Sequence, residues 1–138
     1  MEAFTAQYNI YMEAEDIGQS RIHKSTEFVK NLIQNCRSVY LKSAVLDDES
    51  DLDEFALRLY IEHKIQEDAC SSLQDAQDFI PDLAEFLDAI AAAHSFLDME
   101  GSFSWEYKRE KAAYRFRSES GWDYCDFIEK EKEEEAMP

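Results

Sequence analysis

Residues that form tight turns are scarce in this chain. Its 138 residues include three glycines and two prolines, whereas 45% are hydrophobic and 13% are aromatic. Proteins rich in β-strands need many tight turns, and glycine and proline form those turns most readily. Their scarcity favours long helices, and the hydrophobic content argues against disorder. We therefore expect an all-α fold: a single helical domain over residues 1–138, built as a bundle of four or five helices.

The spacing of apolar residues supports helices in three segments. Apolar side chains recur at three- and four-residue steps over residues 20–45, 51–70 and 81–98. The acidic run from Asp47 to Asp51 supplies N-cap chemistry for the second helix, and Pro81 suits the first position of the third. The third segment is the most apolar, which places it at the centre of the bundle.

Other segments are open to a second interpretation. Residues 1–18 alternate as a strand would, yet some of their aromatic residues also fit helical spacing. Residues 105–117 are expected to be helical, although alternating aromatic residues there also fit a β-hairpin. The turn of that hairpin, residues 109–111, lacks Gly, Asn and Asp, which favours the helix. A short extended segment at the N-terminus or near residues 122–128 is an alternative, and residues 129–138 are expected to form a charged, disordered tail.

The charge of the chain is strongly negative. Fourteen basic residues against 31 acidic ones give a formal net charge of −17. This charge repels nucleic acid phosphates and anionic membranes, so we expect no direct nucleic-acid binding. The longest apolar stretch, residues 86–97, contains Asp88, His94 and Ser95 and is too short to cross a membrane. We interpret His94 as a core histidine rather than a ligand.

The cysteines and the N-terminus point to a cytoplasmic protein. Cys36, Cys70 and Cys125 are far apart and form no CxxC pair, which is typical of reduced thiols rather than of a disulfide framework or a zinc site. The N-terminal residues lack the basic start and apolar run of a signal peptide. We therefore expect a cytoplasmic location and no membrane association.

Two acidic clusters interrupt the apolar segments and suggest a metal site. They are residues 62–68 and residues 82–88. If the helices that carry them pack side by side, Glu62, Asp82 and Glu85 converge on one divalent cation. Carboxylates from two facing helices suit Mg²⁺ or Mn²⁺. Alternatively, Asp82 and Glu85 are first-turn acids that interact with the helix dipole by about 0.3–1 kcal/mol each, and Glu62 pairs with Arg58.

Residues 52–128 resemble the all-α nucleotide pyrophosphohydrolases, the MazG-like and phosphoribosyl-ATP pyrophosphohydrolase-like group. That family carries an E-E-x-x-E motif on one helix, E-x-x-D on the next, and a third helix with a basic end. Residues 59–66 stand at the first motif, although His63 and Gln66 replace glutamates. A shifted register that uses Glu67 or Asp68 restores acids but moves them around the helix. Residues 82–85 resemble the second motif with Asp and Glu exchanged, and residues 103–116 are similar to the third helix.

The resemblance implies Mg²⁺-dependent hydrolysis of a nucleoside triphosphate, releasing the nucleoside monophosphate and pyrophosphate. The implied catalytic residues are Glu62 and Glu85, and the implied phosphate-binding residues are Lys111 and Arg115. The implied ligands of Mg²⁺ (or Mn²⁺) are Glu62, His63, Asp82 and Glu85. Because the family builds its site at a subunit interface, the resemblance also implies a homodimer.

A second function, from a different class, fits the same sequence. A non-catalytic acidic protein that masks the basic surface of a protein partner needs no metal motif. An inhibitor, an immunity-type protein or a DNA mimic would belong to this class. The net charge of −17 and the incomplete first motif favour it, whereas the order of the motifs favours the enzyme.

Overall fold

The fold is an antiparallel sheet with helices on one face. A computed structural model describes residues 4–67 and 72–129. Its helices are α1 (Gln19–Asn35), α2 (Val39–Lys42) and α3 (Ser72–Ala93). Its strands are β1 (Phe4–Ala14), β2 (Val45–Asp48), β3 (Leu57–Glu67), β4 (Asp98–Tyr107), β5 (Glu110–Ser118) and β6 (Asp126–Glu129).

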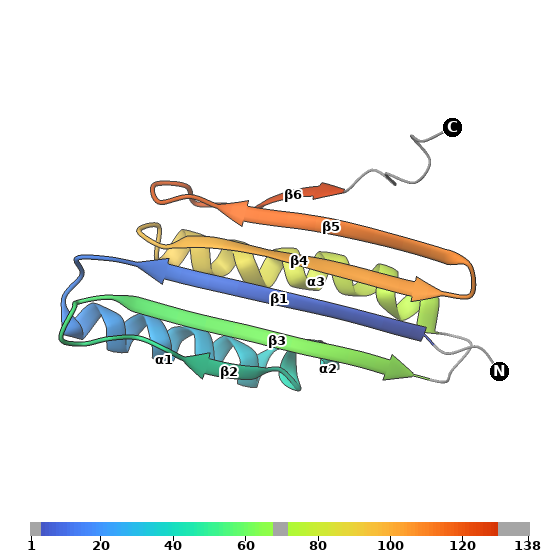
Figure 1. Ribbon diagram of the computed structural model, residues 1–138, viewed down its shortest axis with the longest axis horizontal. Helices are drawn as coiled ribbons and strands as arrows, with labels where there is room; N and C mark the ends of the chain where they lie inside the picture. Colours follow the sequence, from blue (N-terminus) through green and yellow to red (C-terminus); the bar gives the residue numbers. More distant parts are fainter. Residues whose placement is uncertain (1–3, 68–71, 130–138) are drawn as a thin grey trace.

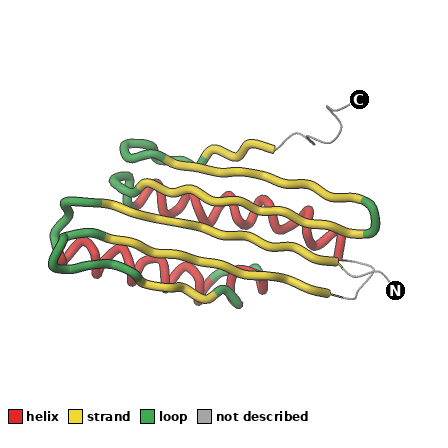
Figure 2. The backbone as a smooth tube through the Cα atoms, in the orientation of Figure 1, coloured by secondary structure: helices red, strands yellow, loops and turns green. Residues whose placement is uncertain are grey.

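The strands form one sheet in the order β2-β3-β1-β4-β5-β6, with antiparallel neighbours throughout. Helices α1 and α3 run along the same face of this sheet (Figures 1 and 2), and no helix of residues 4–67 and 72–129 covers the opposite face. We call that opposite face the open face. The run β1-α1-β2-β3-α3-β4 has the element order of the ferredoxin-like split βαβ arrangement, and β5 and β6 extend its sheet.

The core lies between the sheet and the two long helices. Alternate residues of each strand point to it because successive side chains of a strand face opposite sides. On β1 the buried side chains are Ala6, Tyr8, Ile10, Met12 and Ala14, and on β3 they are Leu57, Leu59, Ile61 and Ile65. From the helices, Ile22, Val29, Leu83, Leu87 and Ile90 complete the core. The intervening strand residues face the open side and are mostly polar.

The expected all-α bundle is wrong, and so is the MazG-like resemblance, because six strands make up the sheet. The clearest error concerns residues 51–70, where β3 replaces the expected helix. A helix would have carried Glu62 along its apolar stripe. A strand buries Leu57, Leu59, Ile61 and Ile65 on one side and leaves Glu62 exposed. Full burial of such a side chain contributes about 1.5–3 kcal/mol, which outweighs the differences in intrinsic propensity.

The second error concerns residues 105–117, which form most of the β4–β5 hairpin rather than a helix. The hairpin closes at the Tyr107–Glu110 pair. Lys108 supplies the turn with a left-handed backbone (φ 58°) although it is not Gly, Asn or Asp. Pairing of β4 along β1 holds this turn in place, which the local sequence does not reveal.

Other boundaries also differ from expectation. Residues 4–14 are the central strand β1, which agrees with the strand interpretation of that segment. The helix expected over residues 20–45 ends at Asn35, and Pro81 lies inside α3 instead of opening it. The alternative extended segment near residues 122–128 corresponds in part to β6. Of the expected tail, Glu129 belongs to β6, and residues 130–138 lie outside the described residues, as does Cys70.

Candidate functional site

The residues of the expected metal site lie on two sides of the sheet. Glu62 is exposed on the open face of β3, and its phenolic neighbour Tyr60 donates a hydrogen bond to it (Oη–Oε2 2.9 Å). His63 points the other way, with its ring 5.8 Å from that of buried Tyr8. Asp82 and Glu85 are exposed on α3, which covers the helical face. The sheet therefore separates Glu62 from both acids of α3.

Metal donors are also not grouped elsewhere in residues 4–67 and 72–129. Within those residues no three His, Cys, Asp or Glu side chains are arranged to hold a metal ion. The expected phosphate-binding residues, Lys111 and Arg115, are exposed on β5. They share the open face with Glu62, but β1 and β4 lie between β5 and β3.

The open face instead brings together two tyrosines and four carboxylates. In the register of the sheet, one row of directly opposed residues crosses six strands: Asp47 on β2, Tyr60 on β3, Tyr11 on β1, Glu100 on β4, Arg117 on β5 and Asp126 on β6. Glu13 and Glu62 lie two residues beyond the tyrosines on β1 and β3, on the same face. We call these six residues, Tyr11, Tyr60, Glu13, Glu62, Asp47 and Glu100, the tyrosine–carboxylate patch.

Each tyrosine of the patch is held by a glutamate of its own strand. The phenol of Tyr11 donates to Glu13 (Oη–Oε2 3.1 Å), and the phenol of Tyr60 donates to Glu62. Because β1 and β3 are antiparallel, the two glutamates lie on opposite sides of the tyrosine row. The pKa of Tyr60 is raised, first by its hydrogen bond to Glu62 and then by burial. The pKa of Tyr11 is raised by burial first, and then by Glu13.

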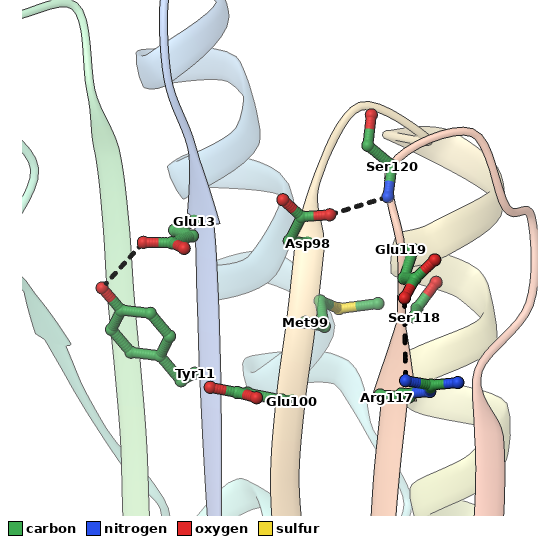
Figure 3. Close-up of a pocket in the computed structure, with 9 residues that line it drawn as sticks. All are labelled: Tyr11, Glu13, Asp98, Met99, Glu100, Arg117, Ser118, Glu119 and Ser120. Atoms are coloured by element: carbon green, nitrogen blue, oxygen red, sulfur yellow. Dashed lines mark hydrogen bonds and ion pairs between the residues drawn. The ribbon is translucent and has the colours of Figure 1, made fainter.

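A groove adjoins the patch between β1 and β5. The β4 side chains at the floor of the groove are small. There, Asn9 Nδ2 donates a hydrogen bond to Ser102 Oγ across 3.1 Å. One end of the groove has a volume of about 500 Å³ and is drawn in Figure 3. Its lining residues include Tyr11, Glu13, Asp98, Glu100, Arg117, Glu119 and Ser120. The adjoining end, of about 750 Å³, is lined in part by Tyr11, Glu100, Arg115, Arg117 and Ile128.

Negative charges outnumber positive ones in this groove. At the end shown in Figure 3, four carboxylates face one guanidinium. That guanidinium, of Arg117, is paired with Glu119 (Nη1–Oε1 3.7 Å) and lies over the Trp122 ring, 5.7 Å from its centroid. Asp98 accepts a hydrogen bond from the Ser120 amide (2.8 Å). An incoming cation would therefore meet carboxylates and the Tyr11 ring together.

The tyrosines, Glu13 and Glu100 were missed by the sequence analysis, although a signal for most of them exists. The triplets Tyr11-Met12-Glu13 and Tyr60-Ile61-Glu62 each place a tyrosine and a glutamate on one face of a strand, with a buried residue between. The alternation of residues 57–62 reveals this pattern once the segment is assigned to a strand. Only the pairing of β1 with β3 and β4 shows that the triplets are neighbours.

Comparison with known proteins adds no family assignment. Protein-family models, curated proteins and solved structures all give no significant match to this chain. Among the described residues, no helix is long and apolar enough to cross a membrane.

Proposed function

We propose that this protein is a non-catalytic acidic binding protein whose tyrosine–carboxylate patch receives arginine and lysine side chains from a basic protein partner. The observation that carries the proposal is the part of the six-strand row from Asp47 to Glu100, where two tyrosines lie between two carboxylates. The net charge of −17 attracts such a partner over distance. An inhibitor or an immunity-type protein would work in this way.

The chemistry of the patch suits cationic side chains. A guanidinium or ammonium group over a tyrosine ring gains about 0.5–1 kcal/mol at an exposed site, and about 2 kcal/mol when water is excluded. A carboxylate beside it adds a surface ion pair worth about 0–1 kcal/mol. Each contact alone is weak. Useful affinity therefore requires a partner that presents several basic side chains to Tyr11, Tyr60 and the adjoining carboxylates at once.

The open face favours a specific docking surface over imitation of a nucleic acid duplex. A duplex presents negative charge without interruption. Here Arg58 and Lys64 on β3, and Arg115 and Arg117 on β5, stand among the acidic residues of the same face. This alternation of sign selects one orientation of a partner, since like charges brought face to face are repelled. A cytoplasmic location belongs to the same proposal, because Cys36 and Cys125 are free thiols.

Titration with a short arginine-rich peptide tests the proposal. Isothermal titration calorimetry gives the affinity, and amide NMR shifts locate the peptide on the molecule. We expect shifts on β1, β3 and β4 and an affinity that falls as salt is added. A glutamate-rich peptide of equal length should not bind.

Matched variants distinguish binding at the patch from attraction by the net charge of the protein. Glu13→Gln with Glu100→Gln removes two charges at the patch, and Glu27→Gln with Glu85→Gln removes two exposed charges from the helices. We expect the first pair to weaken peptide binding at least about tenfold, equivalent to about 1.4 kcal/mol, and the second pair by less than about twofold. Replacing Tyr11 and Tyr60 by leucine should weaken it by about 5- to 30-fold. Equal losses in both glutamate pairs would reduce the binding to net charge and refute the proposal.

A further inference from the structure

His94 lies at a corner where three parts of the fold meet. It follows the last residue of α3, and its amide still bonds to the Ile90 carbonyl (2.8 Å). Its ring stands edge to face with Phe28 of α1, with centroids 4.9 Å apart, and with Phe96 of the link to β4, at 5.6 Å. The imidazole is thus enclosed by aromatic rings from two directions.

The two ring nitrogens of His94 differ in their partners. Nδ1 is 3.4 Å from the hydroxyl of Ser25, which is fully buried on α1. Nε2 is buried and has no hydrogen-bond partner in the described part of the chain. When the imidazole is neutral, the unpartnered Nε2 carries no net charge. A protonated one places a charged N–H donor at the same position, with no acceptor, and an unpaired buried charge is strongly disfavoured.

The charged groups around this corner do not provide that acceptor. On α1, the Arg21 guanidinium lies over the Phe96 ring, 5.3 Å from its centroid, and it is a cation. Beyond the link, the Asp98 carboxylate is bound to the Ser120 amide. From the β5–β6 loop, the Gly121 amide donates a hydrogen bond to the Ser95 carbonyl, next to His94. Burial lowers the pKa of His94. The carboxyl end of α3 favours a cation, most strongly in a partly buried geometry, and this effect opposes that of burial on the His94 pKa.

The same corner holds one wall of the binding groove. Directly after His94, the Ser95 carbonyl accepts a hydrogen bond from the Gly121 amide (2.6 Å). Asp98, at the end of the link, binds the Ser120 amide, and both Asp98 and Ser120 line the groove of Figure 3. The link of residues 94–98 therefore joins the histidine corner to the loop that carries Glu119, Ser120 and Gly121.

We infer that His94 is an acid-sensitive latch for this groove: its neutral ring holds α1, α3 and the 94–98 link together, and its protonation releases the loop of residues 119–121. As a mechanism that regulates binding, the latch rests on the proposed function. The consequence is a groove that is formed near neutral pH and loosened as the pH falls below about 6.5, the ordinary pKa of histidine. A basic partner would then be released on acidification, before most carboxylates take up protons.

NMR between about pH 7 and 5 tests the latch on the intact protein. The imidazole of His94 should titrate below about pH 6.5, the ordinary pKa of histidine. Over the same range the amides of Ser120 and Gly121 should lose at least about tenfold in exchange protection, after correction for intrinsic rates. His94→Gln, which stays neutral, should abolish this pH dependence, and His23→Gln should keep it.

The outcomes are distinguishable. If His94 titrates at or above about pH 6.5, or if the protection of Ser120 and Gly121 does not depend on pH, the latch is refuted. Neither result requires a variant that folds. Binding of the arginine-rich peptide, measured at the two ends of the pH range, should weaken in the natural protein and stay constant in His94→Gln. If no peptide binds near pH 7, the proposed function fails, whereas the imidazole titration and the amide exchange still decide whether the corner opens.

Discussion

The ring of Phe116 on β5 lies directly over the backbone of Gly101 on β4. The two residues are opposed in the register of the sheet. A Cβ atom placed on Gly101 would come within 2.6 Å of the Phe116 ring and would also collide with the carbonyl oxygen of Asn9 on β1. Gly101 therefore lets three strands approach one another where the groove is formed. The position requires the absence of a side chain rather than backbone freedom, because no unusual φ is involved.

Replacing Gly101 by alanine should destabilise the protein. The added methyl group forces Phe116 or the β1 backbone to move, and overpacking of this kind costs about 1–3 kcal/mol. Urea unfolding measures the change. Gly18→Ala is the matched control, since nothing lies within 4 Å of a Cβ at Gly18, and its effect should be below about 1 kcal/mol. Equal effects of the two substitutions would contradict this account of the packing.

The hydroxyl of Tyr8 is a second structural contact that can be tested. Tyr8 is buried on β1, and its Oη donates to the Tyr40 carbonyl on α2 across 2.6 Å. Tyr8→Phe removes this buried hydrogen bond, so we expect a loss of about 1–2 kcal/mol in the free energy of unfolding. Tyr60→Phe removes an exposed hydrogen bond to Glu62 and should cost less than about 0.5 kcal/mol. A loss below about 0.5 kcal/mol in Tyr8→Phe would contradict this account of the Tyr8 contact.

Alkaline pH should weaken the fold through the same residue. Burial, and to a lesser extent Cys36, raises the pKa of Tyr8 above its usual value near 10. The folded state therefore holds the phenol proton more tightly than the unfolded chain. This contribution to stability is complete below about pH 10 and declines as the pH rises further. Urea unfolding from about pH 8 to 11 should show a decline that is shallower in Tyr8→Phe. The same slope in both proteins would exclude Tyr8 as a cause.

Asp88 should contribute more to stability than the other acids of α3. Its carboxylate accepts the amide of Cys125 (2.6 Å) and so joins α3 to the start of β6. Asp88→Ala removes a hydrogen bond to a charged acceptor, and we expect a loss of about 1.5–3 kcal/mol together with faster amide exchange at Cys125. Glu85→Ala, which changes an exposed acid of the same helix, should have an effect below about 0.5 kcal/mol. Similar results for the two variants would show that the Asp88 contact adds no stability.

Part of the fold can be predicted from local patterns in the sequence. The three- and four-residue apolar spacing after residue 19 matches α1, where Ile22, Val29 and Ile33 are buried. The alternation of residues 4–14 matches β1. The prediction was wrong where a short apolar run fits both the helical period and the strand period. In residues 57–65 the alternation Leu57, Leu59, Ile61 is as regular as the helical stripe through Leu59, but scarce glycine and proline favoured the helix.

The scarcity of glycine and proline wrongly favoured helices, because two of the turns do not use these residues. At the β4–β5 turn Lys108 takes a left-handed conformation, and in the β2–β3 connection Phe55 does the same. In that connection Asp51 bonds to the amides of Asp53 and Glu54 and pairs with Ala56 across the loop. Aspartate and strand pairing stabilise turns that composition alone does not indicate.

The amino-acid sequence by itself determined the large negative charge, the helical period of α1, and the identity of every acid that a partner or a cation could meet. Only the tertiary structure decided which of those acids are neighbours. Glu62 and Asp82 are acids of similar local context, yet the sheet separates them, whereas Tyr11 and Tyr60, far apart in the chain, lie opposite each other. The physical reason is that side-chain direction in a strand follows local alternation, but the pairing of strands depends on the burial of the whole core.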